Sequence, residues 1–302
     1  MRLVALCIFS RARGLSVASS SLLRRAVETL RSAGVPEAEA SAEWLLAHAV
    51  GSTTRYVPSE ISAEQRSLFE AYVARRAKRE PTQYIVGRWA FHGVEVTVRP
   101  PTLVPRPETE ELVERIIEWW GDRPARFVDI CCGTGCIALA LRETLPGSSC
   151  LAFDIDDAAV SLATENAAGR FPVLRRSAEE PRPPTEPPYD FVVSNPPYIP
   201  TAELATLDPE VALFEDRAAL DGGEDGLDVV RSILEHAPTY LDPDSARTVW
   251  LELDVSHPKK LLEDRRTLVP DGVLLDTFDD LFGNPRFARL VFPKHLCGVG
   301  GR

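Results

Sequence analysis

The chain has 302 residues and 44% of them are hydrophobic, which suits one large and one small domain around a buried core. Its formal net charge is −11 at pH 7 and its pI is about 5.1. Nucleic-acid-binding proteins carry a basic surplus, because neutralising phosphates supplies most of their affinity, so we expect no nucleic-acid partner. No apolar run approaches the roughly 20 residues that cross a bilayer, so we expect no membrane partner either.

The first 18 residues are predicted to be a mitochondrial transit peptide. Residues 1–27 hold five serines, no acidic residue, and five arginines: Arg2, Arg11, Arg13, Arg24 and Arg25. Transit peptides are rich in arginine and serine and poor in acid, whereas a secretory signal needs a longer apolar stretch than Leu3–Phe9. The composition predicts import into the mitochondrial matrix, and a basic tail without a targeting role is the alternative.

Residues 19–80 are predicted to form a small bundle of short amphipathic helices. Apolar residues recur at three- and four-residue steps over Leu22–Leu30, and Gly34 ends this helix. A second helix opens at Pro36, and a third covers Ser62–Arg79. Amphipathicity shows only that one face is buried, so packing and recognition of a partner are both open as the role of this bundle.

The period of the sequence changes over residues 81–104. Tyr84–Val86, Trp89–Phe91 and Val94–Val98 alternate like strands, with glycines at the turns. We therefore expect a β-hairpin that links two domains.

Residues 105–298 alternate between strands and helices. The expected strands are Phe127–Ile130, Cys150–Phe153, Tyr189–Val193, Thr248–Leu253, Gly272–Leu275 and Phe287–Phe292, and the expected helices are Cys136–Arg142, Asp156–Asn166 and Gly226–Ala237. This order predicts an α/β domain with a mostly parallel sheet and helices on both faces.

The six cysteines do not indicate a metal site. They are Cys7, Cys131, Cys132, Cys136, Cys150 and Cys297. No Cys-x-x-Cys pair or nearby histidine completes a tetrahedral ligand set, so we expect no metal. Their irregular spacing favours reduced thiols in an intracellular compartment over a disulfide scaffold.

A turn that follows the first of these strands is the candidate cofactor site. It consists of Cys131, Cys132, Gly133, Thr134 and Gly135. Glycines let the backbone approach a ligand closely, and exposed N–H groups favour an electronegative atom. Asp154 ends the next strand, where a carboxylate can accept both hydroxyls of an adenosine ribose. These features indicate an adenosine-containing cofactor, and leave a nicotinamide dinucleotide and a methyl donor both open.

A second candidate element follows the strand Tyr189–Val193. It is the loop Asn195, Pro196, Pro197 and Tyr198. Ligands of open sheets bind at the carboxyl ends of strands, so this loop is expected to share a cleft with the turn. Prolines lock the backbone. We expect the Asn195 side-chain oxygen and the Pro196 carbonyl to accept both hydrogens of a target –NH2 group, and Tyr198 to stack on a planar group.

These motifs resemble those of class I methyltransferases that modify planar nitrogens. More narrowly, the chain resembles the HemK/PrmC family of protein-glutamine N5-methyltransferases, which act on peptide chain release factors. The matching stretches are Glu80–Gly87, Val104–Glu110, Phe214–Glu215, Ala219–Gly226, Leu251–Glu252 and Asn284–Arg286. With the arginine-rich start, the chain looks like the mitochondrial branch of this family.

The resemblance implies a Rossmann-like domain with a seven-stranded, mostly parallel sheet that uses S-adenosylmethionine. The cofactor-binding residues that it implies are Asp129, Cys131, Cys132, Gly133, Thr134, Gly135, Asp154 and Asn195, and the catalytic residues are Asn195, Pro196, Pro197 and Tyr198. The implied substrate is the glutamine of the Gly-Gly-Gln motif in a mitochondrial release factor, with the helical domain as its docking surface.

The chain departs from the family pattern at three places. Cys131 stands where the family usually has glycine, and Asp216 where proline is common. Arg176–Glu179 lacks the acidic residue followed by an aromatic residue that the family usually has here. Glu179 is therefore only a candidate for contact with the adenine.

Two other functions fit parts of the sequence. N6-methylation of adenine in DNA also targets a planar amino group, but such an enzyme extrudes its base and needs a basic groove. A cofactor-binding regulatory subunit without catalysis is the other alternative, and the intact Asn195–Tyr198 loop argues against it.

Overall fold

The computed structural model describes residues 17–52 and 60–297. The predicted transit peptide therefore lies outside the described residues apart from Val17 and Ala18, and so do Cys7 and Gly298, the last residue of the segment 105–298. The chain divides into two compact units, with the boundary between Val86 and Gly87.

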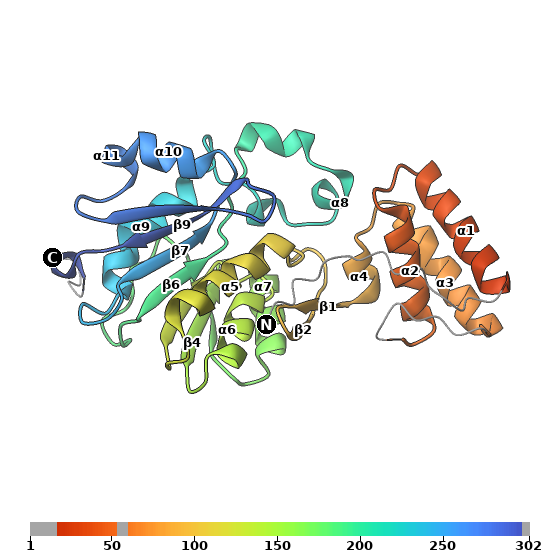
Figure 1. Ribbon diagram of the computed structural model, residues 1–302, viewed down its shortest axis with the longest axis horizontal. Helices are drawn as coiled ribbons and strands as arrows, with labels where there is room; N and C mark the ends of the chain where they lie inside the picture. Colours follow the sequence, from red (N-terminus) through yellow and green to blue (C-terminus); the bar gives the residue numbers. More distant parts are fainter. Residues whose placement is uncertain (1–16, 53–59, 298–302) are drawn as a thin grey trace. The chain divides into compact units, whose positions relative to one another are not determined.

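The first unit is helical (Figure 1). Its helices are α1 (Val17–Ser32), α2 (Ala38–Ala49), α3 (Ala63–Arg76) and α4 (Thr82–Val86). Leu22, Ala26 and Leu30 recur at four-residue spacing on α1 and are buried in a core shared with α2 and α3. A capping box starts α3, in which Ser62 and Gln65 each accept the other's backbone N–H. The predicted helical bundle is confirmed.

The predicted strand at Tyr84–Val86 is wrong, since this stretch belongs to α4. The N–H groups of Tyr84 and Ile85 both donate to the carbonyl of Pro81, at 3.1 and 3.2 Å, which closes a helical turn. Pro81 has a fixed φ and no N–H of its own, so it suits the start of a helix. Tyr84 and Ile85 are both buried, so neighbouring side chains do not alternate between core and solvent.

The second unit opens with the predicted hairpin, formed by β1 (Arg88–Phe91) and β2 (Val94–Thr97). Its two turn residues both have positive φ, 39° at His92 and 82° at Gly93. Such a turn matches the twist of the flanking strands, so it closes the hairpin tightly.

A seven-stranded sheet in the order β5-β4-β3-β6-β7-β9-β8 forms the centre of the second unit. Its strands are β3 (Arg126–Ile130), β4 (Ser149–Asp154), β5 (Val173–Arg175), β6 (Phe191–Ser194), β7 (Thr248–Glu252), β8 (Leu274–Asp279) and β9 (Pro285–Val291). Strands β3 to β7 are parallel, and β9 runs antiparallel to β7 and β8. The strand order reverses between β3 and β6, the place where open sheets bind ligands. The predicted Rossmann-like sheet is confirmed.

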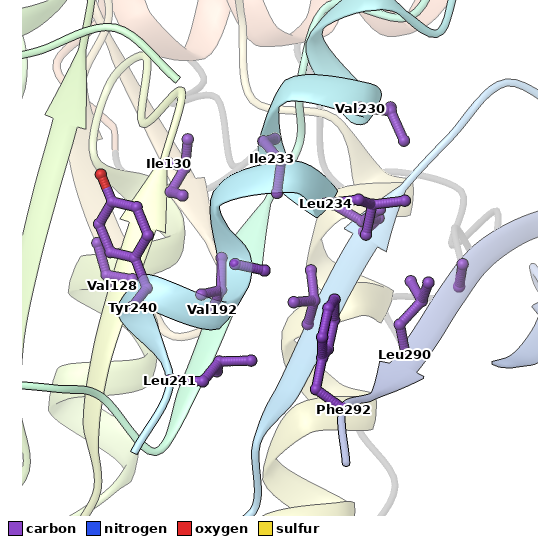
Figure 2. Packing of buried hydrophobic residues seen from close by; sticks show 14 of the residues in the cluster. Val128, Ile130, Val192, Val230, Ile233, Leu234, Tyr240, Leu241, Leu290 and Phe292 are labelled. Carbon is purple, nitrogen blue, oxygen red and sulfur yellow. The ribbon is translucent and has the colours of Figure 1, made fainter. Parts of the chain in front are cut away.

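Helices cover both faces of this sheet. They are α5 (Pro107–Trp120), α6 (Cys136–Thr144), α7 (Asp157–Ala167), α9 (Asp228–Tyr240) and α10 (His257–Glu263). Two short helices, α8 (Pro209–Ala212) and α11 (Arg265–Leu268), lie in the connections. On one face Phe127 stacks on Phe191, and Trp120 of α5 packs against Phe191. On the other face Val192 packs with Ile233 of α9 (Figure 2). Burial on both faces explains why the central strands read as continuous apolar runs.

Candidate active site

The predicted cofactor turn and the Asn195 loop lie at the same edge of the sheet. In the parallel register, Ile130 of β3 is paired with Phe153 of β4 on one side and with Ser194 of β6 on the other. The segments that follow these strands therefore begin next to one another. The Ser194 hydroxyl also donates to the carbonyl of Ile130 at 2.6 Å, which fixes the start of the Asn195 loop against β3.

The turn after β3 wraps around the end of β4. The N–H of Cys132 donates to the carbonyl of Phe153 at 3.1 Å, and the N–H of Gly135 donates to the carbonyl of Cys132 at 2.7 Å. Gly135 has φ 76°, and a Cβ atom there would lie 3.2 Å from the Cβ of Ala163, so glycine lets the turn pack on α7. The carbonyl of Thr134 accepts a hydrogen bond from Asn166 at 2.9 Å.

Asp154 holds this turn with its carboxylate. One oxygen accepts from the N–H of Gly133 at 2.9 Å and the other from the N–H of Asp156 at 3.0 Å. The cap of α7 is Asp156, whose side chain accepts from the N–H of Ala159 at 2.7 Å. A carboxylate has about four acceptor positions, so Asp154 retains acceptor capacity for two ligand hydroxyls.

Asp129 lies fully buried beneath the turn. One of its oxygens accepts from the N–H of Ala138 at 3.1 Å, and the other has no hydrogen-bond partner among the described residues. Burial raises the pKa of Asp129 to about 8, and the negative charge of Asp154 adds to this effect. A ligand with positive charge at the turn would stabilise the ionised form of both carboxyl groups.

The neighbouring thiols are not set up as nucleophiles or ligands. Cys131 is half-buried and Cys132 is buried. Burial raises the pKa of both thiols, so they stay protonated at neutral pH. Within residues 17–52 and 60–297, no group of three histidine, cysteine or acidic side chains is arranged to hold a metal ion.

The Asn195 loop is connected to two residues that the local pattern did not single out, Thr109 and Glu252. The Asn195 amide nitrogen donates to the Thr109 hydroxyl at 3.1 Å, and that hydroxyl donates to one Glu252 oxygen at 2.7 Å. The Tyr198 hydroxyl donates to the other Glu252 oxygen at 3.2 Å. Pro196 is buried, whereas Pro197 and Tyr198 are half-buried.

The segment 214–226 holds the far end of this loop. The N–H of Ile199 donates to the carbonyl of Leu220, and the N–H of Gly222 donates back to the carbonyl of Ile199, both at 2.9 Å. Glu215 is buried and accepts two hydrogen bonds from Arg106, at 2.6 and 2.7 Å. The segment thus ties the loop to the chain that leads into α5.

Two of the departures from the family pattern have structural explanations. Cys131 has φ 61°, in the left-handed region that glycine adopts without strain. The N–H of Asp216 donates to the carbonyl of Pro101 at 2.7 Å, and its side chain accepts from the N–H of Ala218. Asp216 thus makes a backbone hydrogen bond that proline lacks. Glu179 is exposed, so its contact with adenine stays a prediction.

Known families match both units of the chain. The sequence model of the PrmC N-terminal domain matches residues 21–87, and that of the methyltransferase small domain matches residues 109–212. The chain is 35% identical to the human MTRF1L release factor glutamine methyltransferase over 85% of its own length and 82% of the relative's. It belongs to the family of release factor glutamine methyltransferases.

Bacterial members of this family are similarly close. The release factor glutamine methyltransferase of Geobacter sulfurreducens is 41% identical over 74% of this chain and 78% of that protein. The one from Deinococcus radiodurans is 37% identical over 89% of this chain and 96% of that protein. Like them, the chain is an S-adenosylmethionine-dependent methyltransferase. No helix in the described ranges is long and apolar enough to span a membrane.

Proposed function

We propose that this chain transfers a methyl group from S-adenosylmethionine to the side-chain nitrogen N5 of the glutamine in the Gly-Gly-Gln motif of a mitochondrial peptide chain release factor. The observation that carries this proposal is the position of the Asn195 loop at the sheet edge that also presents Asp154. Membership of the release factor glutamine methyltransferase family supports the choice of substrate.

The residues around the β3 turn fit the cofactor. Asp154 has acceptor positions for the two ribose hydroxyls. A cationic ligand at the turn would stabilise the ionised form of the buried Asp129 carboxyl, whose pKa burial raises to about 8. Gly133, Thr134 and Gly135, with Cys131 and Cys132, let the backbone approach the cofactor closely. When bound, S-adenosylmethionine supplies a methyl group on a positively charged sulfur.

The chain's own contribution is to orient a poor nucleophile. An amide nitrogen is unreactive because its lone pair is delocalised into the carbonyl. The Asn195 side-chain oxygen and the Pro196 carbonyl each accept a hydrogen bond from one N–H of the target amide, so that the nitrogen lone pair faces the methyl group. Such alignment is worth several kcal/mol, and the same two oxygens stabilise the positive charge that develops on nitrogen. Pro197 keeps this backbone rigid.

The first unit is proposed to bind the release factor, in keeping with its match to the PrmC N-terminal domain. The arginine-rich residues 1–18 are proposed to direct the chain to the mitochondrial matrix. Import is tested by fusing residues 1–18 to a fluorescent protein. The control is a second fusion in which the same segment is scrambled and contains acidic residues.

The test of activity uses the full chain, because α1 begins at Val17 and a shortened chain would lose part of it. The enzyme is incubated with methyl-labelled S-adenosylmethionine and a mitochondrial release factor, a copy with the motif glutamine replaced, or duplex DNA. Label on the intact factor alone, lost in Asn195→Ala, is the expected result. Label on DNA would replace the proposal with adenine methylation, and binding of the cofactor without any transfer would favour a regulatory subunit.

A further inference from the structure

We propose that Thr109 and Glu252 are positioning residues that fix which way the Asn195 side-chain amide faces. This inference rests on the proposed function, in which the Asn195 oxygen accepts a hydrogen bond from the target amide. It assigns a role to two buried polar side chains that neither the turn nor the Asn195 loop contains.

Hydroxyl groups from two separate segments converge on the carboxylate of Glu252, which lies on a third. Thr109 lies in the first turn of α5, Glu252 is the last residue of β7, and Tyr198 lies in the loop after β6. Thr109 and Glu252 are 2% and 1% exposed, so water does not compete for these hydrogen bonds. The two Glu252 oxygens accept from different hydroxyls, at 2.7 Å from Thr109 and 3.2 Å from Tyr198.

The number of protons available decides the direction of each hydrogen bond between Glu252, Thr109 and Asn195. A hydroxyl has one proton to donate, and an ionised carboxylate only accepts. Once Thr109 has donated to Glu252, its oxygen only accepts a further hydrogen bond. Asn195 must therefore present its NH2 group to Thr109, which it does at 3.1 Å. The amide oxygen is then forced to the opposite side, so the carboxylate sets an orientation that an isolated asparagine leaves free.

The orientation depends on the charge of Glu252. Burial is the main cause that raises the pKa of Glu252, from its ordinary value near 4.5 to about 7. Arg286 and the hydrogen bonds from Thr109 and Tyr198 act in the opposite direction, and the charge of Glu108 raises the pKa further. Burial also raises the pKa of Tyr198, so this phenol remains a proton donor.

Protonation of Glu252 then removes the constraint. A neutral carboxyl group donates one hydrogen bond itself, so Thr109 no longer needs to donate and its hydroxyl can turn toward Asn195. We therefore expect kcat to fall as the pH drops through about 7. Glu252→Gln keeps the shape but places a permanent donor at the same site, so it should resemble the protonated enzyme at every pH.

The test compares Thr109→Val, Thr109→Ser and Glu252→Gln in the full chain, with the release factor as substrate. Thr109→Val should lower kcat by about 100-fold, the effect of a misplaced reacting group, and leave the dissociation constant for S-adenosylmethionine within about twofold. Thr109→Ser keeps the hydroxyl and should restore kcat to within about threefold of the wild type. Glu252→Gln should have a lower kcat that no longer falls as the pH drops through about 7.

The matched control is Thr248→Val. Thr248 is also buried, lies on β7 like Glu252, and donates only to the nearby carbonyl of Ala246. If Thr109→Val and Glu252→Gln both behave like Thr248→Val, with the wild-type pH profile retained, the inference is overturned while the proposed function stands. If the wild type itself transfers no methyl group to the factor, both fail. Should Thr109→Val not fold, the pH profile of Glu252→Gln alone decides the question.

Discussion

A Cβ atom on Gly226 would lie 2.4 Å from the carbonyl oxygen of Tyr198. It would also lie 2.7 Å from a ring carbon of His257, which is buried on α10. The end of the Asn195 loop therefore packs directly against the backbone of Gly226, where there is no room for a side chain. The φ of 77° at Gly226 adds a second reason for glycine.

Gly226→Ala is therefore expected to displace the loop and reduce methyl transfer by at least about tenfold, because catalysis depends on the alignment of Asn195 and Pro196. Gly169→Ala is the matched control. Gly169 has nearly the same φ, 78°, but nothing lies within 4 Å of its added Cβ. The control should lose about 1 kcal/mol of unfolding free energy and keep its activity. Equal activities in the two variants would show that the contact with Tyr198 does not hold the loop.

Unlike Gly226, position 131 carries a side chain, although its backbone conformation favours glycine. Its φ of 61° costs about 1 kcal/mol for a residue with a Cβ atom. Cys131→Ala keeps this strain and Cys131→Gly removes it, while both lose the thiol. We expect Cys131→Gly to be more stable than Cys131→Ala by about 1 kcal/mol in urea denaturation. If Cys131→Gly is less stable than Cys131→Ala, the backbone at position 131 carries no strain that glycine relieves.

Much of the fold was predictable because its signals are local. The β3 turn and the Asn195 loop each lie within a few consecutive residues, and strand order then brings them together. Helix α5 was missed, although Leu112, Val113 and Ile116 recur at helical spacing and are buried. The sequence of α4 predicts a strand instead of a helix, because a short apolar run such as Tyr84–Val86 has no decisive period.

The residues that support the site were predictable only in part. Thr109 and Glu252 both lie in stretches that match the family, but they are 143 positions apart in the chain. No rule of sequence spacing predicts a contact over so many positions, because this contact depends on how α5 packs beside β7. The orientation of Asn195 depends on which groups donate and which accept between Glu252, Thr109 and Asn195, and the sequence alone does not contain this information.

The pair of Arg106 and Glu215 is expected to contribute to stability in a non-additive way. The Glu215 side chain is 1% exposed and the Arg106 side chain 31%. Arg106→Met leaves a carboxyl group buried without its partner and should cost about 3 kcal/mol of unfolding free energy. The double variant Arg106→Met, Glu215→Met should recover a large part of that loss.

An exposed pair serves as the control for this measurement. Lys259 and Glu263 lie 3.5 Å apart with side chains 76% and 63% exposed, so Lys259→Met should change stability by less than about 0.5 kcal/mol. Additive losses in the Arg106 and Glu215 variants would mean that the two side chains do not depend on each other. The same variants also report on the Asn195 loop, which the segment around Glu215 holds in place.

Asp129 should make the stability of the cofactor-free protein depend on pH. Its pKa rises from an ordinary 3.8 to about 8 in the folded state, chiefly through burial. Between these values the folded protein binds more protons than the unfolded chain, so unfolding free energy falls as the pH rises, by at most about 1.4 kcal/mol per pH unit. Asp129→Asn removes this effect and should gain stability relative to the wild type from pH 5 to pH 8.

Urea denaturation at four pH values across this window measures the difference, with Asp271→Asn, at an exposed position, as the control. A difference between Asp129→Asn and the wild type that stays constant with pH would mean that Asp129 is already ionised in the folded protein. Adding S-adenosylmethionine should shrink the difference at pH 8, because a bound cation compensates the buried charge of the wild-type carboxylate alone.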